Sequence, residues 1–230
     1  MFALTDVEIQ ALSLSLWVSC WAVAGSLPIG ILSAWVLARL EFPGKSLLDG
    51  VLHLPLVLPP VVVGYLMLIG LGRNGPIGKV LYDTFGLTIA FTWKGAALAS
   101  AVIAFPLMVR SIRLSLESVD RGLEDAARTL GASPARVFFT ITVPLMAPGI
   151  LAGTILAFAR SLSEFGATIT FVSNIPGETR TLPLALYNLT QVPGSEYAAA
   201  RLCIISIIVA FATLLSSEAL ARRMRSRLEA

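Results

Sequence analysis

The stretch IQALSLSLWVSCWAVAGSLPIGILSAWVLA, residues 9–38, contains no Asp, Glu, Lys, Arg or His. The hydrocarbon core of a bilayer is about 30 Å thick, so a helix needs roughly 20 mostly apolar residues to cross it. Residues 9–38 therefore predict a membrane-spanning helix. Pro28 and Gly30 predict a kink within it, which neighbouring helices can tolerate.

The composition of the whole chain supports a membrane protein. Of its 230 residues, 56% are hydrophobic and 13% are charged, and the mean hydropathy is +0.82. A soluble domain carries about 25% charged residues. The net charge is only +3, and no Lys and Arg run is interleaved with aromatic residues, so nucleic acid is a poor candidate partner. His53 is the only histidine, so we expect no histidine-based metal site or catalytic triad.

The remaining apolar runs predict further spans. Candidate spans lie near residues 9–38, 51–72, 88–113, 140–163 and 198–221. We therefore predict an all-α, polytopic membrane protein with about five transmembrane helices in a single domain, residues 1–230. Residues 72–79 are expected to form a polar loop, Gly166 a turn, and residues 182–189 a short half-buried helix. A sixth span between Phe165 and Leu189 stays open, although Pro and Gly residues there argue against it.

The positions of Lys and Arg predict the orientation, because cytoplasmic loops are enriched in these residues. Placing the N-terminus outside and the C-terminus inside puts most of them on the cytoplasmic side. The residues placed inside are Arg39, Lys45, Arg110, Arg113, Arg121, Arg128, Arg136, Arg222, Arg223, Arg225 and Arg227. In this orientation the central charged segment, residues 120–136, faces the cytoplasm.

The central segment overlaps the stretch EDAARTLGASPARVFFTITVPLMAPGI, residues 124–150. Its sequence predicts two helices joined by a tight turn. Asp120 is a candidate N-cap, and Glu124 and Asp125 favour the early turns of a helix. Gly131 suits a left-handed C-cap, and Ser133 followed by Pro134 starts the next helix. The residues alone leave two interpretations open: a docking surface for a partner, or a cytosolic loop that lies on the membrane.

The spacing of this segment resembles the EAA motif of ATP-binding cassette importer permeases. That motif has Glu-Ala-Ala, three free positions, Gly, nine free positions and Ile-x-Leu-Pro. Here Asp125 stands for the Glu and Val143 for the Leu, and the other elements keep their register. The resemblance implies a cytoplasmic coupling helix that docks on a separate ATPase subunit. The ATPase-coupling residues that it implies are Glu124, Asp125, Ala126, Ala127, Gly131, Ile141 and Pro144.

A wider resemblance covers nearly the whole chain. The segments FPGKSLLDGVLHLPLVLPPVVVGYLML (42–68), FPLMVRSIRLSLESVD (105–120) and LAFARSLSEFGATITFVSNIPGETRTLP (156–183) are similar to the permease subunits of molybdate transporters. This implies a homodimer of permeases in the cytoplasmic (inner) membrane, with an ATPase subunit and a periplasmic molybdate-binding protein as partners. Tungstate, or sulfate and thiosulfate, remain alternative cargoes.

Two further expectations concern catalysis and the class of transporter. No phosphate-cradling Gly-Lys loop is present, so ATP and Mg²⁺ are expected on the partner subunit, with no cofactor and no catalytic residue in this chain. A stand-alone secondary transporter or channel is the alternative class. Such a protein usually shows paired halves or internal repeats, and no clear repeat is seen here.

Four residues are candidates for the translocation pathway or its gate: Arg160, Glu164, Pro59 and Pro60. Arg160 lies about 24 Å beyond Pro144 along a helix, near the outer boundary of the bilayer core. Charges inside a membrane usually face a cavity or a partner, which suggests a role near the outer mouth of an anion path. The alternative is an ion pair between Arg160 and Glu164 within one helix, since they are four residues apart. Pro59 and Pro60 are expected to kink or break the second span.

Overall fold

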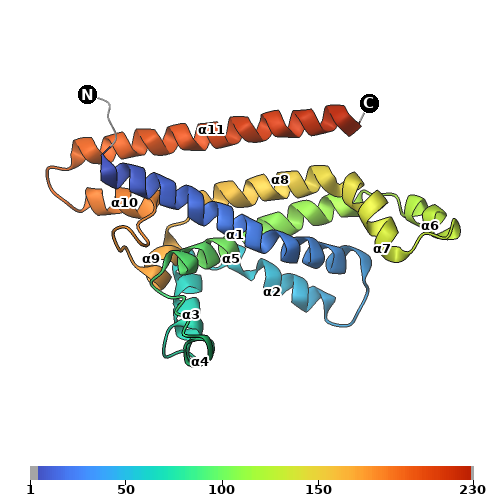
Figure 1. The fold of residues 1–230 in the computed structure, drawn as a ribbon, viewed down its shortest axis with the longest axis horizontal. Helices are drawn as coiled ribbons and strands as arrows, with labels where there is room; N and C mark the ends of the chain where they lie inside the picture. The colour runs from blue at the N-terminus through green and yellow to red at the C-terminus, as the bar shows by residue number, and fades with distance from the viewer. Residues whose placement is uncertain (1–4, 229–230) are drawn as a thin grey trace.

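Four long helices lie along the length of the molecule in the computed structural model, which describes the backbone of residues 5–228 and the side chains of residues 5–216 (Figure 1). They are α1 (Asp6–Arg39), α5 (Trp93–Glu117), α8 (Val143–Leu162) and α11 (Glu196–Leu228). Two short segments, α7 (Pro134–Val137) and a π-helix, η1 (Phe138–Thr142), lead into α8 and lengthen that span to Pro134–Leu162. The described residues form helices and no strands, which confirms the predicted all-α membrane fold.

Helix α5 packs against both α1 and α8 and forms the centre of the molecule. Its buried residues Met108, Ile112 and Leu116 pack with Leu37 of α1 and Met146 of α8. Small residues allow the backbones to approach closely, as is usual in membrane helix packing. A Cβ atom at Gly149 of α8 would lie only 3.0 Å from the Ser111 carbonyl oxygen of α5. The close contact between α5 and α8 therefore depends on glycine, which has no side chain, at position 149.

The second span is broken at residues 58–59, where Pro59 and Pro60 were expected to kink or break it. It consists of α2 (Lys45–Val57) and α3 (Pro60–Leu71), whose axes differ by 114°. A residue before proline is driven out of the helical region; accordingly, Leu58 (φ −69°, ψ 142°) and Pro59 (φ −54°, ψ 131°) are both extended. The described helices give four spans by length and composition, or five if this bent pair counts as one.

The segment between the second and third spans also differs from the prediction. Helix α4 (Pro76–Phe85) includes part of the expected polar loop at residues 72–79, because Pro76 occupies the first helical position, where its missing N–H costs nothing. The third span begins at Trp93 and not at residue 88. The Thr92 hydroxyl accepts a hydrogen bond from Gly95 N at 3.2 Å and so caps α5, which continues to Glu117.

Two short helices fill the region between α8 and α11. They are α9 (Gly166–Val172) and α10 (Leu182–Thr190), and neither is long enough to cross a bilayer. The chain turns at residues 163–165, so Gly166 is the first residue of α9 and not the turn itself. Helix α10 lies where a short helix is expected, whereas α9 was not predicted. Helix α11 begins at Glu196 and extends beyond the predicted boundary at residue 221.

Candidate functional site

Helix α6 (Arg121–Thr129) and α7 protrude beyond the ends of the long helices, at the end of the molecule where α11 finishes (Figure 1). Asp120 Oδ1 accepts a hydrogen bond from Gly122 N at 2.8 Å, which caps the start of α6. Gly131 has a φ of 87°, a conformation that glycine adopts without strain. The Ser133 hydroxyl then accepts from Arg136 N at 3.3 Å and starts α7. The predicted helix caps at Asp120 and Ser133 and the predicted turn at Gly131 are therefore present.

One face of α6 is open to solvent. Asp125 and Ala126 are exposed there, and Ala127 is half-buried. Asp125 pairs with Arg128 one turn further on, at 3.4 Å. Leu130, just after the helix, is 88% exposed. Small and charged residues beside an exposed leucine form a surface that a soluble partner could cover. The sequence did not predict the exposure of Leu130, because exposure depends on tertiary contacts.

Glu124, next to Asp125, points about 100° away from it around the helix and faces the body of the protein. It is the buried residue of this helix. Its Oε1 atom accepts hydrogen bonds from Arg39 Nη2 at 2.9 Å and from Thr142 Oγ1 at 2.8 Å. Glu124 therefore joins α6 to the end of α1 and to η1, and does not contribute to the exposed face.

The remaining motif residues, Ile141 and Pro144, lie where α7 passes into α8. Ile141 is half-buried in η1 and Pro144 is exposed at the start of α8. Proline lacks an N–H group and cannot donate to the carbonyl four residues earlier. The chain here adopts the wider π-turn, in which Val143 N donates to the Phe138 carbonyl. Single π-turns within α-helices often mark functional sites.

The four pathway candidates gather where two helices break. Arg160 Nη1 and Glu164 Oε2 form an ion pair at 2.7 Å. Glu164 is buried, and its Oε1 accepts from Ala167 N at 2.8 Å, which ties the end of α8 to the start of α9. A Cβ atom at Gly166 would lie 2.8 Å from the Pro60 side chain. The α8–α9 turn therefore lies against the α2–α3 break that Pro59 and Pro60 create.

Helices α3 and α9 continue this contact at close range. A Cβ atom at Gly64 would lie 2.5 Å from the Ala167 carbonyl oxygen and 2.8 Å from the Ala167 Cα atom. The Thr170 hydroxyl donates to the Val61 carbonyl at 3.4 Å across the same interface. Both segments after the breaks are thus held together by backbone proximity, which glycine makes possible.

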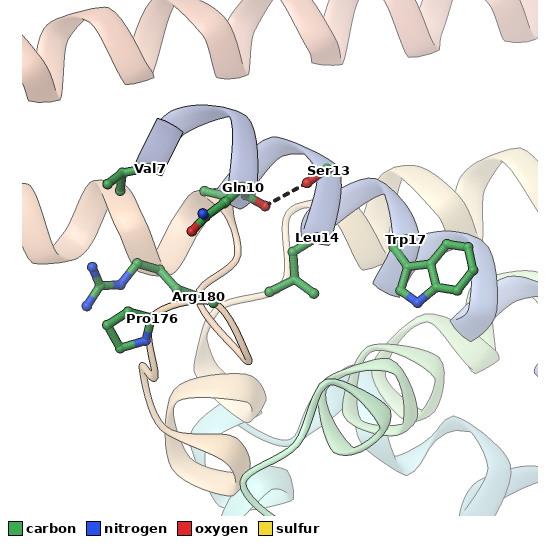
Figure 2. Close-up of a pocket in the computed structure, with 9 residues that line it drawn as sticks. Val7, Gln10, Ser13, Leu14, Trp17, Pro176 and Arg180 are labelled. Atoms are coloured by element: carbon green, nitrogen blue, oxygen red, sulfur yellow. Dashed lines mark hydrogen bonds between the residues drawn. The ribbon is translucent and has the colours of Figure 1, made fainter. Parts of the chain in front are cut away.

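Two hollows lie along α1. A hollow of about 500 Å³ lies between the first half of α1 and the loop at residues 173–181. Figure 2 shows Gln10 and Arg180 toward one end of it and Trp17 at the other. Arg180 Nε donates to Asn174 Oδ1 at 2.9 Å. A larger, mostly apolar hollow of about 730 Å³ lies between α1, α2 and α5. Within the described part of the chain, no group of three or more His, Cys, Asp or Glu side chains could hold a metal ion.

The family model for the inner membrane component of binding-protein-dependent transport systems matches residues 26–226. The chain belongs to this family. Because it belongs to this inner-membrane family and has several long apolar helices, the permease is a multi-pass protein of the inner membrane.

Curated relatives match the permease over nearly its whole length. The molybdenum transport system permease protein ModB of Escherichia coli strain K12 is 69% identical over 224 residues, which cover 97% of this chain and 98% of that protein. The protein of the same name in Haemophilus influenzae is 62% identical over 222 residues, which cover 96% and 97%. The resemblance stated from the sequence is therefore confirmed.

A solved structure supports the fold of the permease. A crystal structure of a bacterial ABC transporter involved in alginate import contains a chain with a TM-score of 0.76 to this one. The match covers 96% of this chain and 80% of that chain at 18% identity. At this identity the match establishes the shared architecture and carries no information on cargo.

Proposed function

We propose that this chain is the permease subunit of an ATP-driven importer that moves molybdate across the inner membrane. The observation that carries the proposal is the 69% identity, over 97% of the chain, to a molybdenum transport system permease. Tungstate, sulfate and thiosulfate are the alternative cargoes. All of these are tetrahedral or near-tetrahedral dianions, so one translocation path could accept them, and the external binding protein would select among them.

A separate ATPase subunit supplies the energy and binds the ATP and Mg²⁺, so this chain is not itself an enzyme. The exposed face of α6, with Asp125 and Ala126, supports this proposal, as does the bare Leu130 beside it. Gly131 holds the turn behind that face, and Ile141 and Pro144 carry the segment into α8. A tilt or shift of α6 would then reach the long helices.

The other partners are a second copy of the permease, a periplasmic molybdate-binding protein and the lipid bilayer. Broad apolar exposure supports a second copy and lipid: Val57 of α2, Tyr65 of α3 and Phe211 of α11 are all exposed. We place the N-terminus outside and the C-terminus inside, which puts α6 on the cytoplasmic side and Arg180 on the periplasmic side.

We place the gate at the contact between the two helix breaks, where Pro59 and Pro60 meet the turn that carries Glu164. The carboxyl group of Glu164 is occupied by Arg160 and Ala167 N, so its role there is to hold the α8–α9 turn. Arg160 is only partly buried, so its guanidinium group, although paired with Glu164, is still accessible to a dianion in the path.

Uptake of radiolabelled molybdate by the reconstituted complex tests this function. Proteoliposomes contain the permease and its ATPase subunit, with the binding protein and ATP supplied on the appropriate sides. We expect ATP-dependent uptake that unlabelled tungstate inhibits more strongly than unlabelled sulfate does. Uptake that continues without the ATPase subunit would favour the stand-alone transporter or channel, and uptake of sulfate in preference to molybdate would change the cargo.

A further inference from the structure

A buried polar cluster lies between α6 and the body of the permease. It consists of Arg39 at the end of α1, Glu124 of α6 and Thr142 of η1, which are far apart in the sequence. The Arg39 and Glu124 side chains are only 10% and 9% exposed. A buried ion pair costs desolvation energy and is weak evidence for stability, so its presence at this point of the chain calls for another explanation.

The geometry of the cluster makes Glu124 a shared attachment point. A single atom, Oε1, accepts from both Arg39 Nη2 at 2.9 Å and Thr142 Oγ1 at 2.8 Å. Glu124 is also the residue of α6 that is buried, whereas its neighbour Asp125, about 100° further around the helix, is exposed. A second, longer hydrogen bond links α6 to α1, from Arg121 Nη2 to the Ala38 carbonyl at 3.4 Å.

The attachment on the far side of Glu124 is a joint in the helix that leads into α8. Thr142 is the last residue of the π-turn η1, and Pro144 follows it two positions later. A π-turn with a nearby proline is a point where a helix bends more readily than elsewhere. A displacement of α6 therefore acts through Thr142 on this joint, and through Arg39 on the end of α1.

We infer that Glu124 is a positioning residue for energy coupling: it fastens α6 to α1 and to the start of α8, so that a movement of α6 displaces both spans together. This inference rests on the proposed function, and it adds a residue that does not touch the ATPase subunit. The exposed face of α6 binds the partner, and the buried carboxylate of Glu124 transmits the movement.

Two substitutions separate the attachment of α6 to the spans from its binding to the ATPase subunit. Glu124→Gln keeps the size and shape of the side chain but removes the charge that pairs with Arg39. Thr142→Val keeps the shape of its side chain but removes the hydroxyl donor. Glu41→Gln is the matched control, because it makes the same chemical change in an exposed ion pair with Lys45, in the loop directly after α1.

The first measurement is the number of molybdate ions taken up per ATP hydrolysed by the reconstituted complex. We expect Glu124→Gln to co-purify with the ATPase subunit and to hydrolyse ATP, but to lower this ratio several-fold. Thr142→Val should lower it less, and Glu41→Gln should leave it unchanged. A merely structural loss would reduce uptake and hydrolysis together. A wild-type ratio in Glu124→Gln, or in Thr142→Val if Glu124→Gln does not assemble, overturns the inference.

The second measurement is amide hydrogen exchange of residues 121–131 in the complex, which needs no cargo. A hydrogen bond to a charged group is worth about a factor of ten or more in a local opening equilibrium. We expect exchange in these residues to be about tenfold faster in Glu124→Gln and unchanged in Glu41→Gln. Equal exchange in the two variants overturns the fastening. If the wild type moves no oxyanion at all, the proposed function fails, whereas the fastening is still tested by exchange.

Discussion

A methyl group at Gly64 should force α3 and α9 apart. It would lie 2.5 Å from the Ala167 carbonyl oxygen and 2.8 Å from the Ala167 Cα atom. Carbon atoms pack best at about 3.5–4.0 Å, so the two helices would have to separate by roughly 0.7 Å. Overpacking of this kind costs about 1–3 kcal/mol, and alanine recovers about 0.5–1 kcal/mol over glycine within a helix. Gly64→Ala should therefore lower the free energy of unfolding by about 1 kcal/mol, and at most by about 2.5 kcal/mol.

Gly70→Ala is the matched control, because it lies in the same helix and a Cβ atom there meets nothing within 4 Å. The assay is thermal unfolding of both purified variants in one detergent, together with molybdate uptake. For a chain of this size, about 1 kcal/mol corresponds to a fall of a few degrees in Tm. Because α3 and α9 follow the two helix breaks, uptake by Gly64→Ala should fall as well. Equal Tm and equal uptake in the two variants would refute the reasoning about close packing.

Three other substitutions have defined outcomes. Gly131→Asp places a side chain at a φ of 87° and a charge on the docking surface; molybdate uptake and coupled ATP hydrolysis should fall while membrane insertion, measured by fractionation, persists. Glu164→Ala removes the partner of Arg160 and the acceptor for Ala167 N; it should destabilise the chain by about 1–3 kcal/mol, and Glu164→Gln, which keeps the acceptor, by clearly less in the same melting assay. Glu8→Gln weakens the 2.7 Å contact with Arg201 that joins α1 to α11; limited proteolysis should then cleave α11 faster, and an unchanged cleavage rate would contradict this role.

Local chemistry explains why much of the fold can be predicted from the sequence. A long uncharged run crosses the bilayer as a helix, because a helix satisfies all of its backbone hydrogen bonds within one segment. The caps at Asp120, Gly131 and Ser133 depend on neighbours within a few residues. In contrast, α9 is only seven residues long and holds its place through Glu164 and through its packing on α3. A helix of that length has no periodicity that a sequence pattern could reveal.

The position of Glu124 shows why the candidate site could be predicted only in part. Glu124 and Asp125 are adjacent acidic residues in the early turns of one helix, and both suit its dipole. Successive residues in an α-helix point about 100° apart, so only one of the two can face a partner that approaches from a given side. The choice is made by Arg39, 85 residues earlier in the chain, and by Thr142, 18 residues later. The motif therefore predicts which residues form the coupling segment, whereas the division between a docking face and a fastening face is a property of the assembled fold.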